Sequence, residues 1–76
     1  MRYLIVIEKA EHNYAAYSPD VPGCVATGKT ARDAEEKMKS ALAMHLRGLL
    51  EDGIALPAAT STADYVEIPA DSVSAG

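Results

Sequence analysis

The sequence contains no tryptophan and no phenylalanine, so its four tyrosines supply all of its aromatic side chains. A core made from this composition is aliphatic, with tyrosine at its margins. The 76 residues predict one domain, and a domain of this size buries only about 60% of the surface that its unfolded chain exposes. We therefore expect a small core, for which oligomerisation is a common remedy.

Cysteine and long hydrophobic runs are also scarce. The single cysteine, Cys24, excludes a disulfide within the chain. The apolar run Leu4–Ile7 is far too short for a signal peptide or a membrane span. These absences predict a cytoplasmic protein that does not associate with a membrane.

Positive charge is the third shortage. The sequence has 7 lysines and arginines but 11 acidic residues, which gives a net charge of −4. Phosphate binding needs clustered lysine and arginine, so the composition argues against nucleic acid as a direct partner of this chain. A negative chain is compatible with a basic protein partner.

The catalytic residue types form no recognisable constellation. A metal-dependent nuclease needs several carboxylates that converge from adjacent strands, and the first predicted strand offers only Glu8. The spacing of the histidines does not indicate a metal pair, because His12 falls in a turn and His45 in mid-helix. We predict that the protein is not an enzyme and has no catalytic, cofactor or metal site. Cys24 is either a small buried hydrophobe or, beside His45, a nucleophile. His45 is either a core histidine bonded to a backbone group or tyrosine hydroxyl, or a pH switch.

Hydrophobic periodicity predicts four strands and one long helix. In chain order these elements are strands at residues 2–9, 14–17 and 24–27, a helix at 30–52 and a strand at 65–68. The β-β-β-α-β order predicts an α+β fold in which one helix packs across one face of a small sheet. We expect residues 1–69 to form a single domain and residues 70–76 a flexible tail.

The helix has clear sequence signals at both ends. Thr30 is a good N-cap, Asp33 completes a weak capping box, and Gly53 fits the position after the C-cap. An apolar stripe with a period of 3.6 residues should face the sheet, and it consists of Ala34, Met38, Ala41, Leu42, His45 and Leu49.

The segment at residues 17–28 is a proline- and glycine-punctuated loop. Pro19 and Pro22 lack N–H donors and fix φ, so the segment is neither regular helix nor central strand. Gly23 can take a positive φ, and Asp20 places one carboxylate at the tip. Stiff loops of this kind often carry recognition. The alternative is a rigid turn that sets the strand register.

Two motifs give the chain a family resemblance. They read Tyr-Ser-Pro-Asp-Val-Pro-Gly-Cys-Val-Ala-Thr-Gly-Lys-Thr and, in the helix, Met-His-Leu-Arg-Gly-Leu-Leu-Glu-Asp-Gly-Ile-Ala-Leu-Pro. Over residues 2–69 the chain resembles the HicB family of antitoxins. The resemblance implies a partly degraded ribonuclease-H-like fold. It also implies an antitoxin that binds and neutralises HicA, a small basic mRNA-cleaving toxin, by masking its active site. The alternative is a stand-alone oligomeric structural or small-ligand-binding module.

The chain departs from the family pattern after its last predicted strand. Many HicB proteins carry a C-terminal helix-turn-helix or ribbon-helix-helix domain that binds the operator. Here only residues 70–76 follow. We therefore expect a short form without the DNA-binding domain.

Two surfaces follow as hypotheses. The toxin-binding surface is expected to combine a tyrosine anchor, the stiff loop and the acidic start of the helix, and consists of Tyr17, Pro19, Asp20, Pro22, Glu35 and Glu36. The second surface joins copies of the chain. Because the first strand is apolar on both faces, we expect a homodimer or higher even-numbered oligomer, joined through a sheet edge or the apolar face that the helix leaves open.

Overall fold

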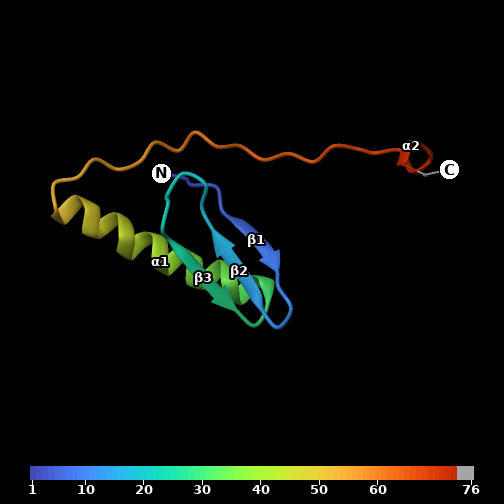
Figure 1. Cartoon of the computed structure of the whole chain (residues 1–76). Coiled ribbons are helices and arrows are strands. Elements are labelled where there is room, and N and C mark those ends of the chain that lie inside the picture. Colours follow the sequence, from blue (N-terminus) through green and yellow to red (C-terminus); the bar gives the residue numbers. More distant parts are fainter. Residues whose placement is uncertain (74–76) are drawn as a thin grey trace.

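Three short antiparallel strands and one long helix form the body of the protein (Figure 1). The computed structural model describes residues 1–73. Its elements are β1 (Val6–Lys9), β2 (Tyr14–Tyr17), β3 (Val25–Gly28), α1 (Ala31–Glu51) and the one-turn helix α2 (Ala70–Val73). The sheet order is β1-β2-β3, and α1 packs across one face of the sheet. The predicted α+β class with a single long helix is confirmed.

The strand register separates an inner sheet face from an outer one. Ala16 pairs with Ile7 on one side and with Ala26 on the other, and all three side chains lie on the face that α1 covers. Since neighbouring residues of a strand point to opposite faces, the next pairs along the strands face outward. β1 begins at Val6, four residues later than predicted, because Val6 pairs with Tyr17, the last residue of β2.

The helix begins where the sequence predicts. The Thr30 hydroxyl accepts a 3.0 Å hydrogen bond from the Asp33 N–H, which caps the first turn. The Asp33 carboxylate in turn accepts a 3.0 Å hydrogen bond from the Lys29 N–H and lies 3.2 Å from the Lys37 ammonium. These two donors, the Lys29 N–H first, hold the pKa of Asp33 below its usual range.

The helix ends in a Schellman motif. Gly53 takes φ +70°, its N–H donates to the Leu50 carbonyl over 3.1 Å, and the Ile54 N–H donates to the Leu49 carbonyl over 2.8 Å. The predicted role of Gly53 is confirmed. The turn reverses the chain, which then returns along the N-terminal side of the sheet (Figure 1).

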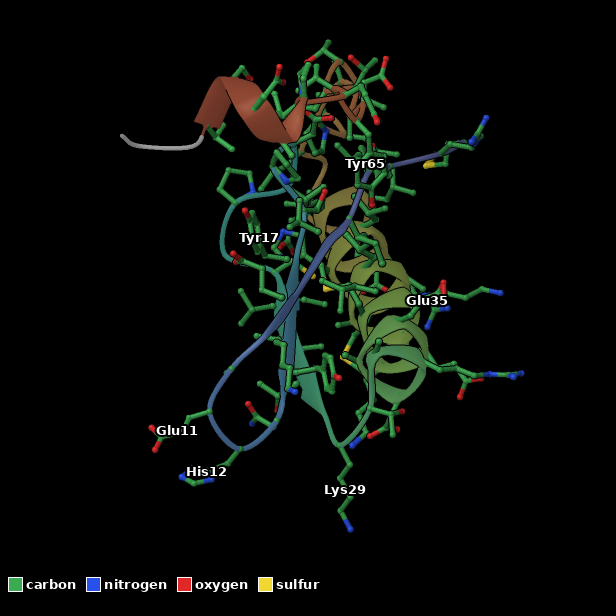
Figure 2. The ribbon with its side chains drawn as sticks, turned by 90° about the vertical axis from the view of Figure 1, so that its right-hand side faces the viewer. Glu11, His12, Tyr17, Lys29, Glu35 and Tyr65 are labelled. Atoms are coloured by element: carbon green, nitrogen blue, oxygen red, sulfur yellow. The ribbon has the colours of Figure 1, made fainter. Side chains whose placement is uncertain are left out.

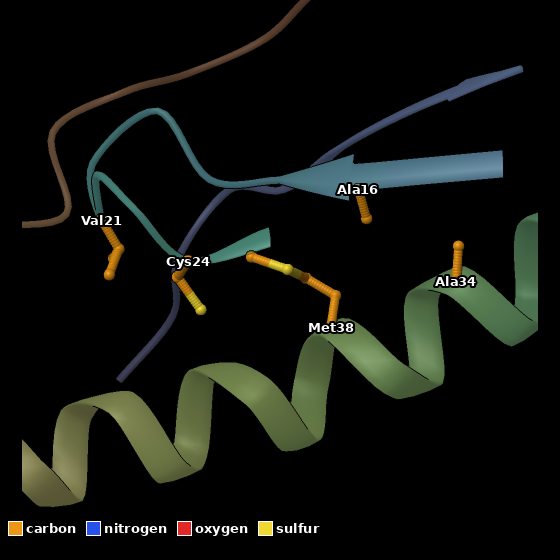
Figure 3. Packing of buried hydrophobic residues seen from close by; sticks show 5 residues of the cluster. All are labelled: Ala16, Val21, Cys24, Ala34 and Met38. Atoms are coloured by element: carbon orange, nitrogen blue, oxygen red, sulfur yellow. The ribbon is translucent and has the colours of Figure 1, made fainter. Parts of the chain in front are cut away.

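The buried core is small and contains no aromatic ring. It lies between the sheet and α1 and consists of Ala16, Val21, Cys24, Ala34 and Met38 (Figure 3). Only Met38 and Val21 are large side chains among them. Tyr3 and Tyr14 pack half-buried at its margin, as the composition predicts.

The predicted fourth strand is wrong for the single chain. Residues 65–68 run extended (Figure 1), but within residues 1–73 they form no ladder with another strand. Tyr65 is 98% exposed, because the chain leaves the body after Ala63 and has no strand beside it (Figure 1). We call residues 64–73 the arm. The predicted flexible tail at residues 70–76 contains α2, and its last part, residues 74–76, lies outside the described residues.

Candidate functional site

The proline loop consists of two successive turns. The Val21 N–H donates to the Ser18 carbonyl over 3.2 Å, and the Cys24 N–H donates to the Val21 carbonyl over 3.4 Å. In the second turn Pro22 fixes φ, and Gly23 takes φ +83°, the pattern of a type II turn. The Val21 side chain is 1% exposed and packs in the core, so it fixes the loop to the body of the protein.

Asp20 does not present a free carboxylate at the loop tip. Its oxygens accept hydrogen bonds from the N–H groups of Ser61 and Thr60, over 2.9 and 3.1 Å, and from their hydroxyls, over 2.8 and 3.3 Å. These donors, the Ser61 N–H first, lower the pKa of the carboxyl group. We call this contact the Asp20 staple. It ties the loop to the returning chain.

A second tie fixes the same returning segment. The Tyr3 hydroxyl donates a 2.6 Å hydrogen bond to the Pro57 carbonyl. Together with the Asp20 staple, it holds residues 57–63 beside the N-terminal segment, where Arg2–Ile5 and Ala59–Ala63 line an open hollow. The arm starts from this pinned segment.

The outer sheet face carries an apolar row across all three strands. Val6 pairs with Tyr17, and Tyr17 pairs with Val25, so the three side chains lie side by side on the face away from α1. Tyr17 is 39% exposed and Val25 is 67% exposed. The exposed prolines Pro19 and Pro22 lie in the loop that joins Tyr17 to this end of β3. The outer sheet face and the loop thus form one continuous surface.

The acidic helix start lies elsewhere. Glu35 and Glu36 line an open hollow between α1 and Ile7 of β1, and Glu36 is 3.4 Å from the Arg32 guanidinium. Figure 2 shows Tyr17 on the sheet side of the molecule and Glu35 on the helix, away from Tyr17. The six predicted binding residues therefore do not form one surface.

The hollow beside Glu35 continues along the helix. A second hollow shares Lys39 with it and is mainly apolar, with Tyr3, Leu42, Leu46 and Leu50 among its lining residues. We call the two together the β1–α1 trough. It is open because α1 packs mainly over β3 and β2, and no strand lies outside β1 in the described chain.

The residue types that carry catalysis are not assembled in residues 1–73. Cys24 is 5% exposed, and burial raises the pKa of its thiol, so it behaves as a small hydrophobe and not as a nucleophile. His45 is half-buried, and the predicted bond to a backbone group or a tyrosine hydroxyl is absent from this part of the chain. No group of three metal-binding side chains occurs there, and no helix is long and apolar enough to cross a membrane.

Comparisons with known proteins decide the family. Residues 3–72 match the HicB-like antitoxin of bacterial toxin-antitoxin systems. The chain belongs to the HicB-like antitoxin family. The predicted resemblance is therefore confirmed.

Relatives of this HicB-like chain come from a phage and a bacterium. An uncharacterised 14.9 kDa protein of the rep–hol intergenic region of Haemophilus phage HP1 is 39% identical over 69 residues, which cover 91% of this chain and 52% of the phage protein. The chain thus spans about half the length of this relative. A UPF0150 protein of Helicobacter pylori is 40% identical over 50 residues, 66% of this chain and 69% of that protein.

A solved structure shares the HicB-like fold. It is described as the HicA3 and HicB3 toxin-antitoxin complex, and one of its chains matches with a TM-score of 0.67 and 32% identity. The match covers 79% of this chain and 70% of that chain.

Sequence reasoning missed two features of the site. Val25 was not assigned to the outer sheet face, although the hairpin pairing places it beside Tyr17. The hydrogen bonds that Thr60 and Ser61 donate to the Asp20 carboxylate are the second feature. The sequence does carry a signal for Val25: if the strands are aligned outward from the turns that connect them, Val25 falls opposite Tyr17. A hydrogen bond between residues 40 positions apart leaves no local sequence signal.

Proposed function

We propose that this chain is an antitoxin that binds a HicA-type toxin and neutralises it by covering the toxin's active site. Membership of the HicB-like antitoxin family and likeness to a chain of the HicA3–HicB3 complex support this function. Occlusion needs no reaction by the chain itself, so the proposed role is binding and not catalysis. The proposed location is the cytoplasm, where an mRNA-cleaving toxin acts.

The outer sheet face is the surface that we propose for the toxin. The observation that carries this assignment is the apolar row on the face away from α1, which is formed by half-buried Val6 and by Tyr17 and Val25, 39% and 67% exposed. Tyrosine is the kind of side chain that anchors interface cores. The two turns beside it are already fixed, so binding costs little ordering entropy there.

Charge complements this apolar surface. The net charge of −4 attracts a basic RNA-binding protein and raises the association rate more than the final affinity. Glu8 lies on the same outer face, because it pairs with Ala15. Binding should therefore weaken moderately with salt, since exposed charges are screened within about 8–10 Å at ordinary ionic strength.

The remaining predicted residues take different roles in this proposal. Asp20 positions the proline loop through its staple and does not contact the toxin. Glu35 and Glu36 lie on the flank of α1 that faces Ile7 of β1, not on the outer sheet face, and stay outside the interface. Pro19 and Pro22 form its rim.

The test compares two exposed apolar positions. Val25→Asp places a charge in the outer sheet face, and Met44→Asp places one on α1, where Met44 is 72% exposed and Val25 is 67% exposed. The toxin partner for this test is sought as a basic protein encoded in the reading frame adjacent to this chain's gene. We expect Val25→Asp to weaken toxin binding by at least about tenfold and to restore RNA cleavage, while Met44→Asp changes neither.

Circular dichroism on both variants checks that the fold is intact. If the unchanged protein neither binds the toxin nor protects RNA from it, the proposed function is wrong. If it protects RNA and the folded Val25→Asp variant protects equally well, the function stands and the outer sheet face is not the interface.

A further inference from the structure

The chain exposes far more surface than a folded protein of its mass. Its accessible area is 6121 Å², whereas a compact monomer of 8.0 kDa exposes roughly 4,450 Å². Its radius of gyration is 16.1 Å, against roughly 11 Å for a compact domain of this length. The excess, roughly 1,670 Å², exceeds the ~800 Å² that each partner buries in a standard interface.

Much of the exposed apolar surface lies on the arm. Tyr65 is 98% exposed, Val66 79%, Ile68 57% and Val73 65%. Residues 65–68 alternate in the manner of a strand, so Val66 and Ile68 point to one side and Tyr65 and Glu67 to the other. This segment has the β-branched composition and extended backbone of a strand but lacks a neighbour.

The body offers a matching acceptor at the edge of the sheet. β1 is an edge strand with no strand on its outer side in the described chain, and unpaired edges of this kind accept a further strand. The β1–α1 trough lies beside this edge, with half-buried Ile7 at its floor. A strand added to β1 would place its inward side chains in the trough.

We propose that the arm of one copy adds as a strand to the β1 edge of a second copy, and that the second copy returns the same contact. Val66 and Ile68 then fill the trough beside Ile7. Tyr65 and Glu67 extend the outer sheet face. The arrangement is isologous, so it closes as a dimer with exchanged arms.

Three observations favour a second copy over other occupants. The staple pins Thr60 and Ser61, so the arm is directed past its own sheet edge and away from the body (Figure 1). Residues 65–68, the segment that the sequence predicts as a strand, match the four residues of β1 in number. The core has only two large buried side chains, and small domains of this kind gain stability by oligomerisation. This proposal does not depend on the toxin surface.

The first experiment measures assembly of the purified full chain without toxin. Sedimentation at tens of micromolar should show about twice the 8.0 kDa of one chain. The double variant Val66→Asp and Ile68→Asp should sediment as a monomer, since buried carboxylates in the trough oppose pairing. The matched control is Val73→Asp, which alters an exposed apolar residue beyond the strand segment and should stay dimeric.

The second experiment identifies the contact by disulfide trapping. In a Cys24→Ala background, Glu8→Cys and Glu67→Cys variants with different mass tags are mixed and oxidised. Both side chains face outward in the proposed strand pair, where neighbouring Cβ atoms are close enough for a disulfide. A mixed disulfide is expected. Glu67→Cys with His12→Cys, in the distant hairpin turn, should give none.

Five results would each overturn the proposal. The unchanged chain stays monomeric, or the Val66→Asp and Ile68→Asp variant stays dimeric. Glu67→Cys links to itself, which indicates arm-to-arm pairing. The doubly substituted Glu8→Cys and Glu67→Cys chain closes a disulfide within a monomer, which places the arm on its own edge. The arm variant loses only toxin binding, which makes the toxin the occupant.

Discussion

Residues 1–63 and the arm at residues 64–73 have a similar apolar fraction, but the first region has a core of buried apolar side chains, whereas the apolar side chains of the second are exposed. Half of the arm is apolar, five of ten residues, and the whole chain is 49% apolar. In the body the register directs apolar side chains to the helix, and the buried ones are at most 5% exposed. In the arm the named apolar side chains are at least 57% exposed. Apolar content therefore predicts that burial of a segment is favourable, but the topology of the chain determines which surface is available to bury it.

The strongest test of this difference compares one apolar side chain from each region. Met38→Ala removes a side chain that is 0% exposed and leaves a cavity, so it should lower the free energy of unfolding by about 2–5 kcal/mol. Val66→Ala, at 79% exposure, should change the unfolding of the single chain by less than about 0.5 kcal/mol. Urea unfolding at a concentration where the chain is monomeric measures both. A large effect of Val66→Ala there would show that the arm packs on its own body.

A pair of glycines sharpens the description of the body. A Cβ at Gly28 would lie 2.8 Å from the Asp33 carbonyl carbon and carboxylate, so Gly28→Ala should destabilise by about 1–3 kcal/mol. Gly48 lies inside α1, and apart from the local helix backbone no atom lies within 4 Å of such a Cβ, so Gly48→Ala should stabilise by about 0.5–1 kcal/mol. Thermal unfolding should give shifts of opposite sign. Shifts of the same sign contradict the close approach of α1 to β3.

The helix cap should have a smaller effect. Thr30→Ala removes the acceptor for the Asp33 N–H and should cost about 1 kcal/mol. Thr62→Ala changes an exposed threonine of the returning segment that makes no hydrogen bond, and it should cost less than about 0.5 kcal/mol. Urea unfolding compares the free energies of unfolding of the two variants. Equal losses would show that the Thr30 cap does not determine where α1 begins.

The smallest effect concerns the joint between body and arm. Hydrogen bonds from Ser61 and Thr60 lower the pKa of Asp20 in the folded state. The staple therefore contributes its full stabilisation above the unfolded pKa of about 4 and loses it as pH falls through the lower folded value. Hydrogen exchange at the Ser61 amide should accelerate, beyond the intrinsic pH dependence, below about pH 4. Asp20→Asn should remove that transition. If protection of Ser61 is insensitive to acid, the carboxylate does not hold the segment.

The body was largely predictable because its determinants are local. The limits of α1 follow from Thr30 and Gly53, each of which acts on backbone groups within a few residues. The hairpin strand 14–17 agrees with the prediction because it lies between a turn and a proline. The family resemblance came from motifs in the same region.

The site and the arm were less predictable because they depend on distant contacts. The face that Tyr17 occupies follows from its pairing with Val6 and Val25, which separates it from Glu35. Asp20 is bound by residues about 40 positions further along. The alternation at residues 65–68 correctly indicates an extended segment, but a strand also needs a neighbour, and no sequence pattern shows whether an edge is free.

The two ties that hold the returning segment also set an order of folding events. The Asp20 staple closes a loop of about 40 residues, and the Tyr3–Pro57 bond joins residues 54 positions apart, while both hairpins connect adjacent strands. Because distant contacts pay more loop-closure entropy, the strands and α1 should form first and the ties last. The direction of the arm is then the final feature of the chain to be fixed.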